Sequence, residues 1–322
     1  MEIKVSVIIC SYNRINDLLE CLKSIDSLEY PFLEIILVDN GSTDGTLELI
    51  KKEHPLIKTI KNSKNMGTSY ARNQAINIAQ GEYLWFLDSD SIIINKKCLD
   101  NMLTFFENNK DIGSVGGQII KENYKLTYWI MGELKDKKYQ KREAEIFEYS
   151  VHYLPTCNCM MKKSLMLILG GFDTNYFYYC EDLDVGLKIR KLGLKNVFKS
   201  DCCVLHSFSQ NARFGDYYLM YRNLLRCLIM NKTFYYIIYF PFTQSCRIFL
   251  DFIKFKKEGG NIKNIKTIKD SEKNRNYSNR GGILKLALKI ISASSRAYLW
   301  NVFHLFETIR ARNTKPEFLE IC

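Results

Sequence analysis

Four short apolar runs in the first 90 residues, each followed by polar residues, constrain the fold of this 322-residue chain more than any other feature. The runs are rich in β-branched and aromatic side chains, and helix-like segments such as Asp17–Ile25 and Ser69–Ala79 separate them. Strands that alternate with helices are typical of βα units around a mostly parallel sheet. The sequence therefore predicts an α/β fold with strands at Val5–Cys10, Leu33–Val38, Ile57–Ile60 and Tyr83–Leu87.

Three of these runs end in loops that carry polar and acidic side chains: Ser11–Arg14, Asp39–Gly45 and Asp88–Asp90. Open α/β sheets bind ligands outside the carboxyl ends of their parallel strands. We therefore expect a ligand site along this edge of the sheet.

The later part of the same domain contains a Lys- and Glu-rich segment and then a second ordered stretch. Residues 121–150 show little periodicity and are interpreted as a solvated, variable insertion. After it, we expect the aromatic loop Tyr176–Tyr179, a helix from Glu181 to about Leu192, and strands near Asn196–Lys199 and Cys203–His206.

Charge divides the chain into two parts. Residues 1–215 hold 27 Lys+Arg and 27 Asp+Glu, whereas residues 216–322 hold 19 Lys+Arg and 8 Asp+Glu, so the excess of +11 lies in the last third. A neutral first domain argues against nucleic acid as its main substrate. The basic second part points to an anionic surface, either phospholipid or nucleic acid. We expect domains at residues 1–215 and 216–322.

The second part is predicted to be helical and basic. Its uncharged stretch, Thr233–Cys246, has 14 residues, fewer than the ~20 needed to span a bilayer. The segment Ile283–Ile309 suits a helix lying in a membrane interface, or one packed on the first domain. Its expected apolar face holds Ile283, Leu286, Ile290 and Ile291, with Lys285, Lys289 and Arg296 elsewhere.

The N-terminal residues lack the pattern of a secretory signal, which favours a reducing cytosol and free thiols for the 11 cysteines. Cys157 and Cys159, and the adjacent Cys202 and Cys203, do not form the C-x-x-C pairs of zinc sites. We expect these four cysteines to be small buried side chains.

The pair Asp88 and Asp90 follows directly on an apolar strand. Two carboxylates at this spacing can hold a hard divalent cation that bridges a diphosphate, although the same pattern also occurs in turns and helix caps. Asp39, after another strand, can accept the imide N–H of uracil or thymine, or it can organise the turn at Asn40–Gly45.

Two further candidates lie late in the domain. Glu181 and Asp182 begin a helix after the aromatic loop, where a carboxylate can deprotonate an acceptor hydroxyl; acidic residues are also common in first turns of helices. His206 ends the last expected strand and is either structural or a ligand of the cation.

Four motifs, kept in order over roughly residues 3–207, resemble those of glycosyltransferase family 2, whose members have the GT-A fold. The chain is therefore identified as a member of that family, with an inverting and non-processive activity. The motifs are VSVIICSYNR, ILVDNGSTDGT, NMGTSYARNQAI followed by GEYLWFLDSD, and GGFDTNYFYYCEDLDVGLKIRKLG.

The resemblance implies a role for each candidate residue. Asp39 would bind the pyrimidine under the loop that holds Ser11, Asn13 and Arg14. Asp88 would contact the ribose or sugar and share with Asp90 and His206 the binding of Mn²⁺ or Mg²⁺. Asp182 would be the general base, with Glu181 orienting it. Residues expected near the nucleotide are Lys64, Asn65 and Arg72.

The resemblance also implies partners and a place of action. The donor would be a UDP- or dTDP-linked sugar, and the acceptor a glycan or lipid-linked glycan used for cell-surface polysaccharide or glycoconjugate. The enzyme would be cytoplasmic and peripheral on the inner face of the cell membrane. The chain lacks the Gln-x-x-Arg-Trp motif of processive synthases, and it has Asp88-Ser89-Asp90 where many rhamnosyltransferases have Asn-Pro-Asp.

Two other functions are compatible with parts of the sequence. A sugar-phosphate nucleotidyltransferase also uses paired carboxylates on such a sheet, but its Gly-rich first loop is replaced here by Ser11–Arg14. A nucleic-acid-binding protein would use the basic tail, but no helix-turn-helix, zinc-finger or RNA-recognition pattern accompanies that tail. We therefore expect no nucleic acid among the partners.

Overall fold

The computed structural model describes residues 3–28, 30–121, 125–126, 148–206, 217–231, 238–239 and 280–313. The chain divides into two compact units, with the division after Phe208. Each unit is described separately. Most of the predicted insertion at residues 121–150 and of the uncharged stretch Thr233–Cys246 lies outside the described residues.

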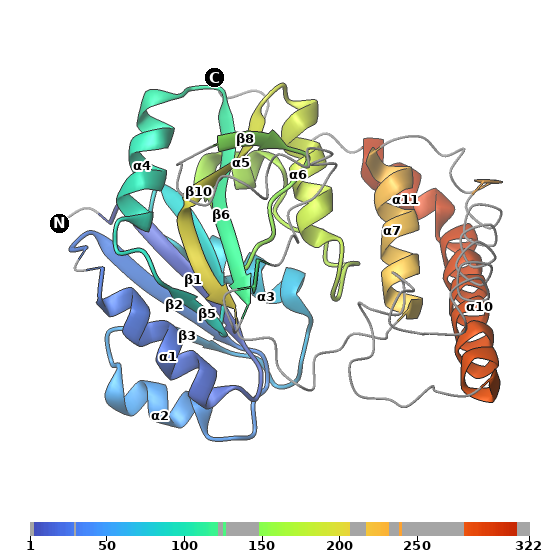
Figure 1. Cartoon of the computed structure of the whole chain (residues 1–322), viewed down its shortest axis with the longest axis horizontal. Coiled ribbons are helices and arrows are strands. Elements are labelled where there is room, and N and C mark those ends of the chain that lie inside the picture. Colours follow the sequence, from blue (N-terminus) through green and yellow to red (C-terminus); the bar gives the residue numbers. More distant parts are fainter. Residues whose placement is uncertain are drawn as a thin grey trace. The chain divides into compact units, whose positions relative to one another are not determined.

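The first half of the first unit is a parallel sheet flanked by helices (Figure 1). Its strands pair in the order β3-β2-β1-β4, and all three pairings are parallel. Both the α/β class and the four predicted strands are confirmed. The elements are β1 (Val5–Ser11), α1 (Ile15–Asp26), β2 (Leu33–Asp39), α2 (Thr46–Glu53), β3 (Lys58–Lys61), α3 (Thr68–Ile78) and β4 (Tyr83–Asp88).

Beyond β4 the sheet becomes mixed, because β9 (Asn158–Lys162) runs antiparallel between β4 and β6 (Ile112–Lys121). The order continues through β10 (Lys195–His206), which is parallel to β6, to β5 (Ser91–Ile93) at the edge. Two short strands pair off this path: β7 (Lys125–Leu126) with β6, and β8 (Glu148–Val151) with β10.

Some elements differ from the sequence prediction. The two strands expected near Asn196–Lys199 and Cys203–His206 are one strand, β10, whose pairing with β6 shifts register between Lys199 and Val204. Strand β6 and two helices were not predicted from the sequence, because no strong turn signals flank their short apolar patterns. These helices are α4 (Cys98–Asn108) and α5 (Lys163–Ile168).

Two apolar clusters cover the two faces of the sheet. Side chains alternate along β1, so that Val7 and Ile9 join one cluster and Ile8 joins the other. The first cluster includes residues of α1 and α4, and the second includes residues of α3, α5 and α6 (Glu181–Lys191). With both faces covered, polar side chains of the strands collect at their carboxyl ends.

The described part of the second unit contains α7 (Tyr217–Asn231), α10 (Arg280–Phe303) and α11 (Leu305–Asn313). Arg226 of α7 is buried and donates a hydrogen bond to Thr308 Oγ1 of α11 at 2.8 Å. Of the expected apolar face of α10, Ile290 is buried in the core with α7, whereas Ile291 is exposed, so these two residues do not share one face as predicted. The core contains Tyr217, Tyr221, Leu225, Ile229, Ile290, Ala293 and Ala297.

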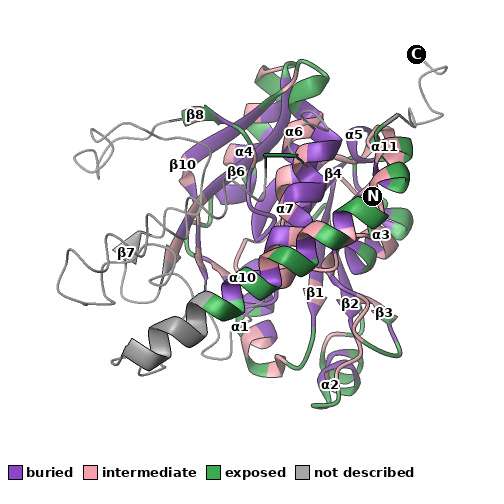
Figure 2. Ribbon diagram, turned by 90° about the vertical axis from the view of Figure 1, so that its right-hand side faces the viewer, coloured by how far each residue is buried: buried purple, intermediate pink, exposed green. Residues whose placement is uncertain are grey.

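Part of α10 remains exposed (Figure 2). Its exposed apolar residues form a stripe that, by helix periodicity, lies on the side opposite Ile290. Its residues recur at intervals of three, four and eight, which places them on one helix face. They are Leu288, Ile291, Leu299, Val302 and Phe303, and Phe306 of α11 is also exposed. No helix among the described residues is long and apolar enough to cross a membrane.

Candidate active site

The loops after β1 and β2 are joined by hydrogen bonds of Asn13. This residue has a φ of 52°, a left-handed conformation that asparagine tolerates better than most residues. Its N–H donates to Ser42 Oγ at 3.0 Å, and its Oδ1 accepts the N–H of Thr43 at 2.8 Å. Asn13 therefore shapes the predicted nucleotide loop.

Asp39 is fully buried at the end of β2. Its Oδ1 accepts the N–H of Ser42 at 3.3 Å, while its Oδ2 is buried without a hydrogen-bond partner among the described residues. Ser11 pairs with Asp39 in the register of β1 and β2, and its buried Oγ also has no hydrogen-bond partner among the described residues. Because a buried polar atom without a partner costs about 1–3 kcal/mol, this pair is suited to a polar ligand.

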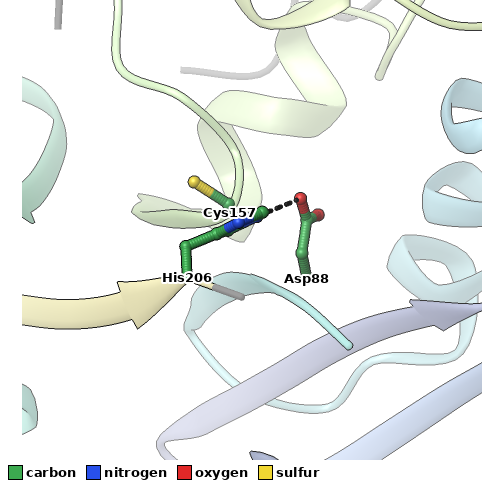
Figure 3. Close-up of side chains that lie close together, drawn as sticks. All are labelled: Asp88, Cys157 and His206. Carbon is green, nitrogen blue, oxygen red and sulfur yellow. Dashed lines mark hydrogen bonds and ion pairs between the residues drawn. The ribbon is translucent and has the colours of Figure 1, made fainter. Parts of the chain in front are cut away.

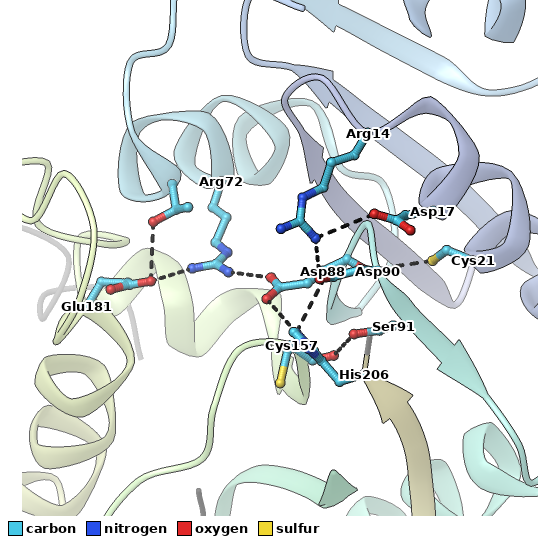
Figure 4. Close-up of polar contacts among 11 residues, drawn as sticks. Arg14, Asp17, Cys21, Arg72, Asp88, Asp90, Ser91, Cys157, Glu181 and His206 are labelled. Atoms are coloured by element: carbon cyan, nitrogen blue, oxygen red, sulfur yellow. Dashed lines mark hydrogen bonds and ion pairs between the residues drawn. The ribbon is translucent and has the colours of Figure 1, made fainter. Parts of the chain in front are cut away.

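Asp88, Asp90 and His206 form a compact group, here called the acidic cluster (Figure 4). His206 Nε2 lies 3.4 Å from Asp88 Oδ2 and 3.4 Å from Asp90 Oδ1. The pairing of β5 with β10 is responsible, since it aligns Ser91 with His206 and so brings the end of β10 beside the turn after β4. The predicted convergence of these three residues is confirmed.

Two arginines compensate the charge of the acidic cluster (Figure 4). Arg14 donates to Asp90 Oδ2 and lies 3.7 Å from Asp17 Oδ2. Arg72, whose side chain is 5% exposed, donates to Asp88 Oδ1 at 3.1 Å. A divalent cation that binds Asp90 must therefore share or displace the contact with Arg14.

Arg72 also links the acidic cluster to α6, because its Nη1 donates to Glu181 Oε1 at 2.9 Å. Thr68 Oγ1 donates to the same carboxylate oxygen at 3.2 Å. Glu181 Oε2 is buried with no hydrogen-bond partner among the described residues. Glu181 is thus fixed by α3, and it positions the start of α6 relative to Asp88.

The cluster's charges shift the pKa values of its members. Burial raises the pKa of Asp88, but the His206 hydrogen bond and Arg72 outweigh it and lower that pKa to about 2. Burial raises the pKa of Asp90, and the charge of Asp88 raises it further. Burial lowers the pKa of His206, but its hydrogen bond to Asp88 and the charge of Asp90 raise it overall.

Asp182 is half-buried in the first turn of α6, and its Oδ1 accepts the N–H of Leu183 at 2.7 Å. Burial and the adjacent charge of Glu181 raise the pKa of Asp182 to about 7. A carboxylate with a pKa near neutrality is both a competent proton acceptor and substantially ionised at pH 7.

The loop before α6 is held in an unusual conformation. Tyr179 and Cys180 have φ values of 72° and 68°, left-handed values that cost about 1 kcal/mol or more in a residue with a side chain. The loop is anchored on α3, where Ser69 Oγ donates to the backbone oxygen of Tyr176 at 2.7 Å. Tyr176 itself is fully buried, so its ring cannot stack on a sugar.

Asn65, another residue predicted to lie near the nucleotide, forms hydrogen bonds within the protein. Asn65 Oδ1 accepts hydrogen bonds from Asn40 Nδ2 and from the N–H of Gly67, each at 3.0 Å. These bonds brace the loop before α3. A contact between Asn65 and a nucleotide stays a prediction.

The burial of Cys157 was predicted from the sequence, but its position next to Asp88 was not. The antiparallel pairing of β9 with β4 aligns Asn158 with Leu87, and so brings Cys157 beside Asp88. Only this pairing, which no local sequence pattern predicts, shows that Cys157 lies close to Asp88. Cys159 and Cys202 are buried as predicted, whereas Cys203 is half-buried.

The donor atoms of the acidic cluster fit a divalent cation. Carboxylate oxygens and one imidazole nitrogen suit Mn²⁺ or Mg²⁺, and the buried Oδ2 of Asp39 lies at the same edge of the sheet. The site therefore combines side chains that suit a cation, two buried polar atoms at Ser11 and Asp39 without hydrogen-bond partners among the described residues, and a carboxylate at Asp182 that can accept a proton.

Comparisons with known proteins agree with this arrangement. The model of the family "Glycosyl transferase family 2" matches residues 6–167, about half of the chain. The chain therefore belongs to glycosyl transferase family 2.

Two curated relatives are similar over part of their length. An uncharacterised glycosyltransferase of Methanocaldococcus jannaschii is 32% identical over 169 residues, which is 50% of this chain and 57% of the relative. The Escherichia coli protein WfaP, a UDP-Glc:α-D-GlcNAc-diphosphoundecaprenol β-1,3-glucosyltransferase, is 36% identical over 124 residues, 38% of this chain and 49% of the relative. The chain thus spans about half the length of these relatives.

A solved structure shares the fold. A mannosyltransferase from Pyrobaculum calidifontis, in complex with GDP-Man and Mn²⁺, superposes with a TM-score of 0.61 at 18% identity, covering 92% of this chain and 87% of that one. This likeness confirms the predicted GT-A fold.

Proposed function

We propose that this chain is a metal-dependent, inverting glycosyltransferase that moves a sugar from a UDP- or dTDP-linked donor to a glycan or lipid-linked glycan. The proposal rests on one network of contacts beside the carboxyl ends of the strands. Its members are Asp88, Asp90, His206, Arg72 and Glu181. Membership of family 2 and the names of its relatives support this reading.

In this proposal the sheet edge binds the donor. Asp39 Oδ2 accepts the imide N–H of the pyrimidine, and the loop of Ser11, Asn13 and Arg14 covers the base. Asp90 and His206, together with Asp88, hold Mn²⁺ or Mg²⁺, and the bound ion supplies neutralisation of the charge that develops on the leaving diphosphate.

Asp182 acts as the general base. Its carboxylate takes the proton of the acceptor hydroxyl, which attacks the sugar C1 opposite the diphosphate in a single displacement. Glu181 is held by Arg72 and Thr68, so it supports the geometry of the first turn of α6 and raises the proton affinity of Asp182.

Donor selectivity tests the role of Asp39. Asp39 Oδ2 is proposed to accept a hydrogen bond from the pyrimidine. Asp39→Asn replaces this carboxylate oxygen with an N–H group or with a weaker, amide oxygen, so UDP binding should weaken by about 10- to 100-fold, the equivalent of about 1.5–3 kcal/mol. Isothermal titration with UDP, dTDP and GDP in the presence of Mn²⁺ measures the effect.

Glu48→Gln is the matched control, since Glu48 is an exposed residue of the neighbouring helix α2. Unchanged UDP affinity in Asp39→Asn, or equal affinity of the wild type for UDP and GDP, would show that Asp39 does not accept a hydrogen bond from the pyrimidine.

A separate assay of released products distinguishes a transferase, which releases nucleoside diphosphate, from a nucleotidyltransferase, which releases inorganic diphosphate.

We also propose that the second unit binds the anionic surface of a membrane on its cytoplasmic side. The exposed stripe of α10 is apolar, and Lys289 and Arg296 lie on the same helix. Residues 216–322 carry the entire excess charge of +11. An apolar stripe with flanking cations is the combination by which helices bind anionic lipid interfaces. A membrane location would bring the site close to a lipid-linked acceptor.

Vesicle sedimentation tests this surface. Leu299→Glu combined with Phe303→Glu removes two exposed apolar side chains and adds two negative charges, so binding to vesicles containing phosphatidylglycerol should fall at least about tenfold. Leu56→Glu, at a 95% exposed residue of the first unit, is the control. Equal sedimentation of the double variant and the wild type would argue against the α10 stripe as the membrane-binding face.

A further inference from the structure

Cys157 brings a thiol into the acidic cluster (Figure 3). One carboxylate oxygen of Asp88, the Sγ of Cys157 and one ring nitrogen of His206 all lie within 4.8 Å of one another. The backbone of Cys157 is held in place, because Asn158 begins β9 and Ser91 Oγ donates to the backbone oxygen of Cys157 at 2.9 Å.

The spacing of these three atoms is close to that around a single tetrahedral ion. Ligand atoms at zinc distances of about 2.0–2.3 Å lie roughly 3.3–3.8 Å apart. Asp88 Oδ2 and His206 Nε2 are already 3.4 Å apart. The sulfur needs to approach the other two atoms by about 1 Å or less, which a change in the side-chain torsion of Cys157 can supply.

The chemistry of this trio differs from that of the Mn²⁺ or Mg²⁺ site. Those ions prefer oxygen ligands, whereas thiolate and imidazole select borderline and soft ions such as Zn²⁺ and Co²⁺. His206 is equally close to Asp88 and to Asp90, at 3.4 Å from each. Asp88 and His206 thus belong to both sets of ligands, and two ions cannot occupy both sets together.

We propose that Asp88, Cys157 and His206 form a thiolate site for a zinc-class ion, and that an ion bound there excludes the metal that supports the transferase. On binding, a bond forms between sulfur and the ion, the S–H bond breaks, and its proton passes to solvent. Three protein ligands leave a fourth position open. The exclusion of the second metal rests on the proposed function, while the thiolate site itself does not.

Cobalt spectroscopy of the full-length, metal-free protein tests the thiolate site. Co²⁺ bound to a thiolate gives a charge-transfer band in the near ultraviolet and visible bands of tetrahedral geometry. The wild type should show both at one equivalent of Co²⁺, and one equivalent of Zn²⁺ should remove them. Cys157→Ser and His206→Ala should each lose the charge-transfer band.

Cys203→Ser is the matched control, because Cys203 is a half-buried thiol of β10 outside the trio. It should keep the full cobalt spectrum, and circular dichroism establishes that each variant is folded. The absence of the band from the wild type, or its persistence in folded Cys157→Ser, would overturn the proposal.

Competition between metals tests the exclusion. Zn²⁺ should inhibit Mn²⁺-supported hydrolysis or transfer of a nucleotide sugar in the wild type, and Cys157→Ser should need at least about tenfold more Zn²⁺ for the same inhibition, as expected when one of three protein ligands is lost. Equal inhibition of both proteins would contradict the exclusion. A protein that shows the cobalt bands but processes no nucleotide sugar would refute the proposed function and leave the thiolate site established.

Discussion

Replacing Asp182 with asparagine is expected to lower the rate of sugar transfer by about 10²- to 10⁴-fold, the usual contribution of a general base. Asparagine has nearly the same shape and keeps an oxygen that can accept the N–H of Leu183, but it cannot take up the acceptor's proton. Donor affinity should be unchanged, because Asp182 is not among the residues proposed to bind the nucleotide or the metal. Steady-state transfer rates, with donor binding measured separately, give the comparison.

The same residue is expected to set the pH dependence of transfer. Because burial and the charge of Glu181 raise the pKa of Asp182 to about 7, the ionised and active form becomes scarce below pH 7 and saturates above it. The wild-type rate should rise through neutrality. The residual activity of Asp182→Asn should lack this rise.

Stability measurements separate this effect from misfolding. A carboxyl whose pKa is raised in the folded state binds its proton more tightly there, so the fold loses stability as the pH rises from about 4 to about 7, and the loss is complete above pH 7. Below about pH 4 both states are protonated and the carboxyl has no such effect. Asp182→Asn should therefore melt higher than the wild type at pH 8 and equally at pH 4. Asp100→Asn, in the first turn of α4, is the control.

Equal transfer rates of Asp182→Asn and the wild type would show that Asp182 is not the general base.

The parallel half of the fold and the main acidic residues could be predicted from the sequence because their signals are local. Apolar runs such as Tyr83–Leu87 define strands by composition, and parallel strands send their carboxyl ends to one edge. Asp39, Asp88 and Asp90 each follow such a run directly, so their placement at that edge required no knowledge of long-range contacts.

Other features depend on pairings between distant segments, which local patterns do not contain. Arg72 meets Glu181, 109 residues away, only because α3 packs beside the start of α6. Cys157 meets Asp88 through the antiparallel insertion of β9. The grouping of Ile290 and Ile291 on one face of α10 was wrong, because the helix is apolar on two sides and only its contact with α7 decides which side is buried.

The second large effect is expected for Asp90→Ala. Asp90 is the buried carboxylate of the acidic cluster, and its loss removes a proposed metal ligand, so metal-assisted binding of the diphosphate should weaken by about 10²- to 10³-fold, or several kcal/mol. The fold should tolerate the change, because Arg14 keeps its neighbour Asp17 and remains partly exposed to solvent.

Equilibrium titration of UDP into the metal-free protein, with and without Mn²⁺, tests the central claim that the acidic cluster binds a cation together with a pyrimidine diphosphate. The account predicts that Mn²⁺ strengthens UDP binding to the wild type and to Asp100→Asn, and that Asp90→Ala loses this gain. UDP affinity that is the same with and without Mn²⁺, or a gain from Mn²⁺ that persists in Asp90→Ala, would contradict it.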